Sequence, residues 1–127
     1  MISTCMPLYQ ADENGNYPIH LAILNGHLEI VKRFIEIGVN LEERDLNGNS
    51  ALHIASQHNQ IKILEILLGN HVKVNSINYF FDTPIHLALM NGHLNIINRL
   101  LDDPHIQINQ KNRRGLTPFH YACRLGN

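Results

Sequence analysis

Nine histidines and two cysteines are the residues of this sequence that could bind a metal ion or act in catalysis. A structural zinc site takes about four such side chains at close spacing, and a nucleophilic cysteine requires a basic partner. Cys5 and Cys123 stand near opposite ends of the chain, and His58, His71 and His105 are scattered without a cysteine or carboxylate at ligand spacing. We therefore expect no catalytic residue, no metal site and no cofactor.

The other six histidines recur at a fixed interval. The tetrads YPIH, SALH, TPIH and TPFH end at His20, His53, His86 and His120, at intervals of 33, 33 and 34 residues. The same period is kept by an alanine two residues later, a glycine or asparagine six residues later, and an aspartate or asparagine eight residues earlier. His27 and His93 each follow a repeated glycine. Such a period indicates a repeat architecture, so these six histidines have a structural explanation.

Each copy of the unit predicts two helices and a loop. A hydroxyl residue stands at the helix N-cap in three copies, as Ser50, Thr83 and Thr117. Proline occupies the first helical position in three copies, and glycine or asparagine ends the helix eight residues after that position. A second helix follows, with apolar residues at helical spacing, as in Leu28, Val31 and Phe34. Polar connectors rich in Asn and Gly, such as 39–49, are typical of a hairpin.

These motifs resemble the ankyrin repeat family. The segment TPIHLA at 83–88, followed by Gly-His and paired leucines at fixed offsets, carries the resemblance, which covers residues 12–127. The resemblance implies an all-α repeat solenoid of stacked antiparallel helix pairs, with β-hairpin loops at right angles to them. It also implies that the four tetrad histidines bond within their turns and to neighbouring backbone. The expected segments are a lead-in or cap at 1–11, repeats at 12–44, 45–77 and 78–111, and a partial repeat at 112–127.

The sequence departs from this pattern at its ends and in copy three. Tyr17 replaces the capping hydroxyl residue of copy one, and copy three has one extra residue around 102–109, where we expect a bulge containing Pro104. Copy four stops after its first helix. We interpret the chain as the N-terminal part of a longer protein, and the alternative is a small protein that ends in a half-repeat cap.

Three aromatic residues interrupt the polar loop of copy three. Tyr79, Phe80 and Phe81 stand together there, and Phe81 fills the slot held elsewhere by Gly15, Gly48 and Gly115. Three glycines in one column indicate a backbone with positive φ, which a bulky residue adopts at a cost of about 1–2 kcal/mol. We interpret the exposed aromatic residues as a binding site. The alternative is that the Phe81 ring folds onto the second or fourth copy.

The resemblance implies that loop tips and the exposed side of the first helices line a groove for partners. Interface cores and hot spots are enriched in aromatic, Met and Arg side chains. We therefore expect a protein-binding module whose contact centre is Tyr79, Phe80, Met90, Arg113 and Arg114. Further expected binding residues are Phe81, Leu46, Gln57 and Arg124. The mixture of aromatic and basic side chains favours a partner with an apolar knob flanked by acidic residues.

Composition disfavours several other classes. The net charge of −1 argues against a nucleic-acid binder, and no apolar run approaches the length of a membrane span. Few cysteines and no glycosylation sequon favour a reducing, cytoplasmic setting. We further expect a monomeric protein that is not an enzyme.

Two alternatives concern a longer protein, in which the module would select substrates for a catalytic domain beyond residue 127 or form part of a secreted effector. Sixteen Asn and sixteen Ile resemble the composition of ankyrin effectors from intracellular bacteria, which would act in the host cytosol. In eukaryotic ankyrin repeats, asparagines in the slot of Asn75 and Asn109 are sometimes hydroxylated. The sequence leaves that modification, the source and the partner open.

Overall fold

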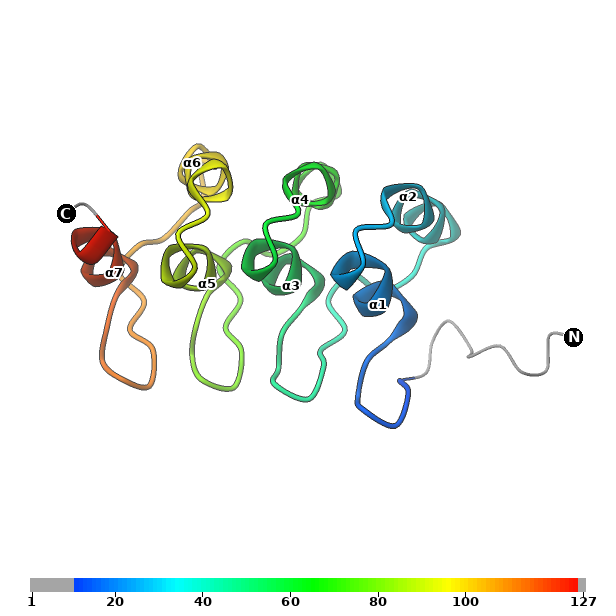
Figure 1. Cartoon of the computed structure of the whole chain (residues 1–127), viewed down its shortest axis with the longest axis horizontal. Helices are drawn as coiled ribbons and strands as arrows, with labels where there is room; N and C mark the ends of the chain where they lie inside the picture. The colour runs from blue at the N-terminus through cyan, green and yellow to red at the C-terminus, as the bar shows by residue number, and fades with distance from the viewer. Residues whose placement is uncertain (1–10, 126–127) are drawn as a thin grey trace, which may run out of the picture.

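The computed structural model describes residues 11–125 of the chain. Seven helices lie within them, as three pairs followed by a single helix along one row (Figure 1). The first helices of the four copies are α1 (Pro18–Leu24), α3 (Ala51–Gln57), α5 (Pro84–Met90) and α7 (Pro118–Leu125). The second helices of the first three copies are α2 (Leu28–Ile37), α4 (Ile61–Leu68) and α6 (Leu94–Leu101). The expected all-α repeat solenoid is confirmed.

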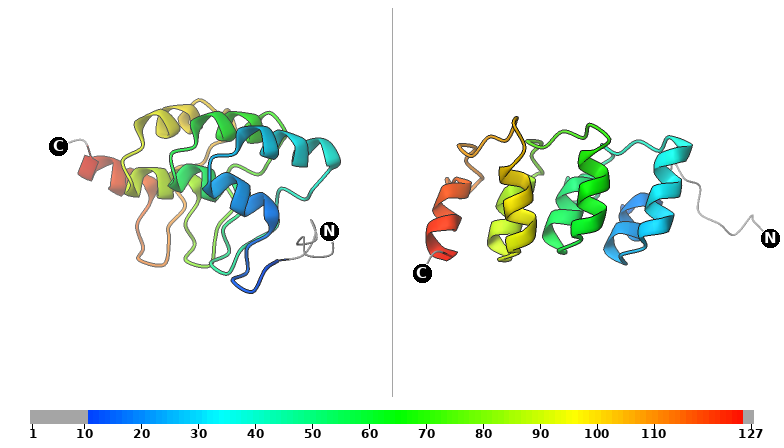
Figure 2. Two further views of the ribbon diagram at one scale, coloured as in Figure 1. Left: turned by 45° about the vertical axis from the view of Figure 1, so that its right-hand side comes forward. Right: turned by 90° about the horizontal axis from the view of Figure 1, so that it is seen from above.

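The helices form two layers. Figure 2 shows α2, α4 and α6 side by side in one layer, above the first helices. The loops that precede the first helices project away from both layers (Figure 1). These loops follow a hairpin path, but residues 11–125 contain no assigned strand, because only a few backbone hydrogen bonds close each tip. Each first helix is thus preceded by a rigid turn rather than by a β-ladder.

His20, His53 and His86 each fix a turn to its helix and to the next copy. In copy two, the Ser50 N–H donates to His53 Nδ1 over 3.2 Å, and His53 Nε2 donates to the Asp82 carbonyl of copy three over 2.8 Å. His20 and His86 make the corresponding pair of bonds, the outer ones to the carbonyls of Glu43 and Leu116. Because Nδ1 accepts and Nε2 donates, each imidazole is held as the neutral Nε2–H tautomer.

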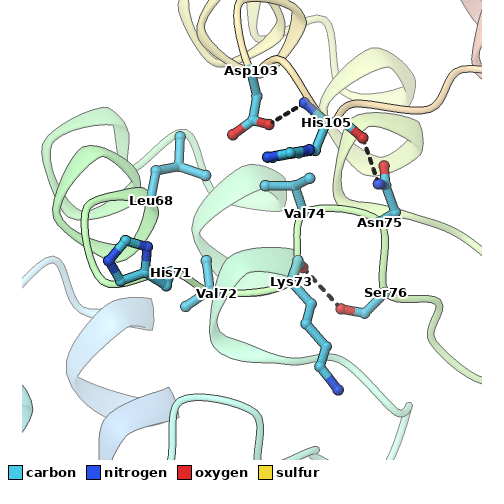
Figure 3. A pocket seen from close by; sticks show the side chains of 9 residues that line it. All are labelled: Leu68, His71, Val72, Lys73, Val74, Asn75, Ser76, Asp103 and His105. Carbon is cyan, nitrogen blue, oxygen red and sulfur yellow. Dashed lines mark hydrogen bonds between the residues drawn. The ribbon is translucent and has the colours of Figure 1, made fainter.

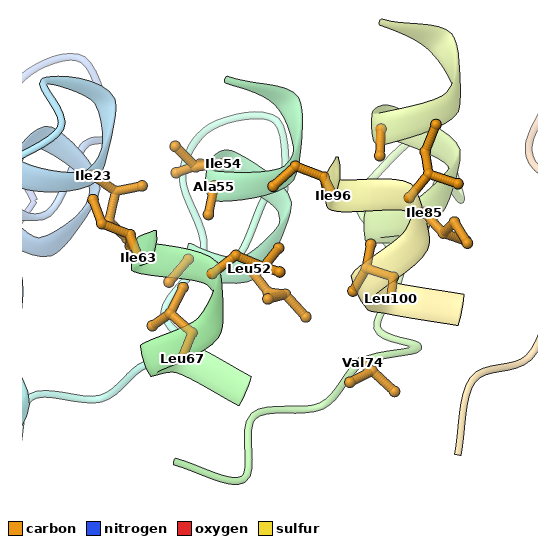
Figure 4. Close-up of a cluster of buried hydrophobic side chains, with 14 of the residues drawn as sticks. Ile23, Leu52, Ile54, Ala55, Ile63, Leu67, Val74, Ile85, Ile96 and Leu100 are labelled. Atoms are coloured by element: carbon orange, nitrogen blue, oxygen red, sulfur yellow. The ribbon is translucent and has the colours of Figure 1, made fainter. Parts of the chain in front are cut away.

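One apolar core runs through the stack between the two layers. Figure 4 shows side chains from the first and second helices of successive copies meeting there, among them Leu52, Leu67 and Leu100. These three leucines are almost fully buried. In the first three copies the second helix covers the first, and α3 also packs against α1 and α5. Each copy is therefore held by its neighbours, as expected for a solenoid. The stacking of the helices also sets the spacing between successive loops.

Candidate functional site

The four loop tips share one backbone geometry. In copy three, the Asn78 N–H donates to the Asp82 carbonyl over 3.0 Å and the Phe81 N–H donates to the Asn78 carbonyl over 3.0 Å. The same two bonds recur in the other three copies. Each tip is a tight turn whose fourth residue is left-handed, with φ of 79° at Gly15 and Gly48, 77° at Gly115 and 63° at Phe81. Phe81 thus keeps the geometry of its glycine counterparts, at the steric cost that a β-carbon brings there.

Neighbouring loops are joined in register. The Tyr79 N–H donates to the Asn47 carbonyl over 3.0 Å, and the Arg113 N–H donates to the Phe80 carbonyl over 2.9 Å. At the base of the loops, the amide groups of Asn78 and Asn112 donate over 2.9 Å to the Oδ1 atoms of Asn49 and Asp82. Since these four side chains are buried, the loop tips are held by bonds that water does not weaken.

Side chains stack on the left-handed residue of the preceding loop. Tyr79 lies over Gly48, where an added β-carbon would come within 2.7 Å of the Tyr79 backbone nitrogen. Glycine at this position therefore serves both the positive φ and the close approach. Over Phe81, the stacked side chain is Arg113, whose guanidinium carbon lies 4.7 Å from the ring centroid. The Phe81 ring thus faces the fourth copy while staying partly exposed, between the two alternatives expected from the sequence.

The exposed side chains of copy three form a cluster on the loop and on α5. The exposed fractions are 56% for Tyr79, 52% for Phe80, 42% for Phe81 and 40% for Met90. We call these four residues the aromatic cluster. Arg113 adds charge beside it, and its side chain is held by the stacking on Phe81 and by a hydrogen bond from Nε to the Tyr79 carbonyl. Apolar surface and a pre-positioned cation therefore adjoin each other.

A pocket of about 190 Å³ opens between the third and fourth loops. We call it the loop pocket, and its lining residues are Phe80, Asp82, Met90, Asn112, Arg113 and Arg114. Four of the five residues of the expected contact centre line it, and the fifth, Tyr79, packs over Gly48 of the second loop instead. Asn112 was not among the expected binding residues, because its column belongs to the repeat. Asp82 occupies a groove slot in the family pattern but was not chosen as a binding residue. The sequence could have indicated a binding role for Asp82, because it is a carboxylate in the slot where copies one and two have the amides Asn16 and Asn49.

Phe81 does not line the loop pocket but belongs to the aromatic cluster, and three other expected binding residues lie outside both. Leu46, in the loop of copy two, is exposed but packs over Gly15 in the loop of copy one. Gln57 is half-buried near the end of α3, and its carbonyl accepts a hydrogen bond from His93 Nε2 over 2.9 Å. The Arg124 guanidinium lies on α7, 5.8 Å from the centroid of the Tyr121 ring. Each lies in a setting of its own, so the sequence-derived set divides into one clustered group and three separate residues.

A larger depression of about 540 Å³ lies between the connectors that follow α4 and α6 (Figure 3). It contains His71, Asp103 and His105, three of the residues that could suggest metal chemistry. Asp103 Oδ1 accepts the His105 N–H over 2.8 Å, and the Asn75 amide donates to the His105 carbonyl over 2.8 Å. Asn75 also accepts the Gln107 N–H over 2.9 Å, so it fastens two connectors together. Within residues 11–125, no three His, Cys, Asp or Glu side chains are grouped as metal ligands.

Burial keeps three of the tetrad histidines neutral by lowering their pKa. Burial lowers the pKa of His53 to about 4, with a further lowering from Arg44, against an upward effect of its bond to the Asp82 carbonyl. Burial also lowers the pKa of His20 and the pKa of His86. A neutral, doubly bonded imidazole has no lone pair left for a metal or a proton transfer. These side chains are structural ties between copies.

A model of a known protein family matches this chain. The family model described as ankyrin repeats (3 copies) matches residues 3–78 and 71–127, which together span nearly the whole sequence. Among curated proteins, no sequence matches this chain. None of the helices in the described part of the chain is long and apolar enough to cross a membrane.

Proposed function

This chain belongs to the ankyrin repeat family, and from that premise we propose that it binds a partner protein through the aromatic cluster and the loop pocket. Ankyrin repeats are generally protein–protein interaction modules. The proposal names the part of this chain that makes the contact. The observation that carries it is the exposure of four large apolar side chains next to two arginines, on loops held in register by buried hydrogen bonds.

The composition of this surface supports the proposal. Aromatic, Met and Arg side chains dominate the hot spots of protein interfaces, whereas isolated exposed apolar residues are ordinary. Tyr79, Phe80 and Phe81 are consecutive, and Met90 reaches the same pocket as Phe80 from α5. An adjacent group of this kind is the arrangement that a partner can bury together.

The rigidity of the loops supports it as well. Binding costs free energy for every side chain and loop that must be ordered, about 0.5–1.5 kcal/mol for each flexible side chain. Here the Asn78 and Asn112 side chains each accept two backbone N–H groups of their own loop, so the tips are already ordered. The proposed mechanism is presentation of a fixed surface, with no chemical step in this chain.

The exposed, free Cys123 on α7 supports a reducing, cytoplasmic setting for this chain.

The test is affinity capture with matched variants. The test variant combines Tyr79→Ala, Phe80→Ala and Met90→Ala. The control variant combines Ile30→Ala, Ile37→Ala and Leu94→Ala, three exposed apolar residues of the second helices. We expect the control to retain every protein captured by the wild type and the test variant to lose at least one of them. Equal capture by the wild type and both variants would refute the proposal.

A further inference from the structure

We propose that the loop pocket receives a tyrosine side chain from an acidic segment of the partner, with the phenolic hydroxyl donating a hydrogen bond to the Asp82 carboxyl group. The inference rests on the proposed function and adds the chemistry of the partner. It follows from the size, the walls, the floor and the rim of the pocket.

The size and walls of the pocket suit one flat apolar side chain. Sites for small molecules are typically about 300–1,000 Å³, and the loop pocket has about 190 Å³. Phe80 from the loop and Met90 from α5 supply its apolar walls. A thioether and an aromatic ring both pack favourably against another aromatic ring. An aromatic side chain of the partner is therefore favoured over a small polar one.

The floor of the pocket offers a hydrogen-bond acceptor that the fold does not use. Asp82 Oδ1 accepts the Asn112 amide N–H over 2.9 Å. In the same slot of copy two, Asn49 Oδ1 accepts the Asn78 amide N–H over 2.9 Å. The hydrogen bonds that join neighbouring loops therefore need only one acceptor oxygen per copy. Within residues 11–125, Asp82 Oδ2 has no bonding partner, and no buried side-chain oxygen or nitrogen lacks one. Oδ2 is therefore not fully enclosed, and Asp82 is one of the residues that line the pocket.

The rim selects the charge of the partner. Arg113 and Arg114 are both exposed, and the ion pairs found among residues 11–125 involve other cations, namely Lys32, Arg33 and Arg99. The two arginines disfavour a lysine or arginine entering the pocket and favour acidic residues on either side of the occupant. Asp82 in turn disfavours a carboxylate at the floor. What remains is a neutral side chain with an apolar body.

Tyrosine satisfies all these conditions. Phe80 and Met90 offer apolar partners to its ring, and its hydroxyl stands at the tip of the ring, where it can donate to Asp82. Phenylalanine lacks the donor, serine and threonine lack the ring, and the tryptophan N–H lies on the edge of a larger ring rather than at its tip. Flanking acidic residues of the partner would then face Arg113 and Arg114.

The first experiment uses blocked peptides and the whole chain. The probes are Glu-Glu-Tyr-Glu-Glu, the same peptide with Phe or phosphotyrosine at the centre, and Lys-Lys-Tyr-Lys-Lys, titrated into ¹⁵N-labelled protein and followed by NMR. We expect the Tyr peptide to shift the amide signals of residues 80–82, 90 and 112–114. The Phe peptide should bind about tenfold more weakly or worse, since a hydrogen bond to a charged group is lost. The Lys-flanked peptide should bind more weakly too.

The second experiment tests Asp82 with a matched control. Asp82→Asn keeps the Oδ1 acceptor, as Asn49 does in copy two, and replaces only the pocket-facing oxygen. The preference for the Tyr peptide over the Phe peptide should fall about fivefold, because a neutral hydrogen bond replaces a charged one. Asn49→Asp makes the reverse change in the loop of copy two and should leave the preference unaltered.

Several outcomes would overturn the inference. They are equal binding of the Tyr and Phe peptides, tighter binding of the phosphotyrosine or Lys-flanked peptide, an unchanged preference in Asp82→Asn, and no shift with any peptide. Binding of other peptides at residues 79–90 would overturn the tyrosine assignment and leave the proposed function standing. The proposed function fails separately, if affinity capture is insensitive to the aromatic cluster.

Discussion

The three buried tetrad histidines, His20, His53 and His86, make the stability of this protein sensitive to mild acid. His53 is buried between copies two and three, where its Nδ1 accepts the Ser50 N–H and its Nε2 donates to the Asp82 carbonyl. A second proton on Nδ1 would oppose that N–H and place a charge in the core. Its pKa is about 4 in the folded protein and about 6.5 in an unfolded chain.

The direction and size of the effect follow from these two values. Above pH 6.5, His53 is neutral in both states and does not make stability depend on pH. Between pH 6.5 and 4, the unfolded chain takes up a proton that the folded protein does not, so stability is progressively lost. The loss reaches on the order of 3 kcal/mol at about pH 4, at 1.36 kcal/mol per unit of pKa difference. His20 and His86 shift stability in the same direction, because burial lowers their pKa as well.

Urea unfolding followed by circular dichroism at several pH values between 7 and 4.5 measures this loss. Domains of this size have about 5–15 kcal/mol of stability, so we expect a large fraction to disappear over that range. His53→Gln should be less stable at pH 7, by roughly 1–3 kcal/mol for the altered bonds, and its stability should fall less steeply with acid. His120→Gln is the matched control, since His120 is the exposed member of the same column. Equal pH slopes in the wild type and His53→Gln would refute the reasoning.

Three further predictions concern the loop, the histidines and the last described helix. Phe81→Gly should raise the free energy of unfolding by up to ~1 kcal/mol, because the relief of ~1–2 kcal/mol of backbone strain exceeds the ~0.5–1 kcal/mol lost with the exposed stacking on Arg113. The same change should weaken partner binding by ~1–3 kcal/mol. A destabilisation above ~2 kcal/mol in urea unfolding would instead mean that the Phe81 ring is part of the core. Thermal melts with and without a chelator should superimpose, and a drop of several degrees with chelator would show that a metal stabilises the fold. Amide hydrogens of residues 112–125 should exchange faster than those of copies two and three, because an end repeat has one neighbour; equal protection through Tyr121 would contradict this.

The internal comparison of one column supports the exchange prediction. Phe119 is 64% exposed, whereas its counterparts Ile19, Leu52 and Ile85 are 3%, 1% and 1% exposed. In the three complete copies, a second helix and the next copy cover this position. Within the described residues, nothing comparable covers α7, so its hydrogen bonds should open more readily.

The sequence alone determined the repeat, the helices and the backbone of the loops. Caps, prolines and left-handed glycines act within a few residues of where they stand, so their columns predict the order of elements in every copy. The positive φ of Phe81 followed from three glycines in its column and is confirmed at 63°. The exposure of Tyr79 and Phe80 agrees with their place on a loop tip. These are local consequences of short-range sterics and hydrogen bonding, which a periodic sequence repeats.

Only the tertiary structure decided which side chains meet. Asp82 and Asn112 are 30 residues apart in sequence and meet because consecutive loops stack in register. The stacking of Arg113 on Phe81 depends on the same register. Sequence columns could not separate Leu46, Gln57 and Arg124 from the loop pocket, because side-chain direction and the offset between copies set those distances. The period of a repeat states which positions are equivalent, whereas the packing of one copy on the next determines which non-equivalent positions form a site.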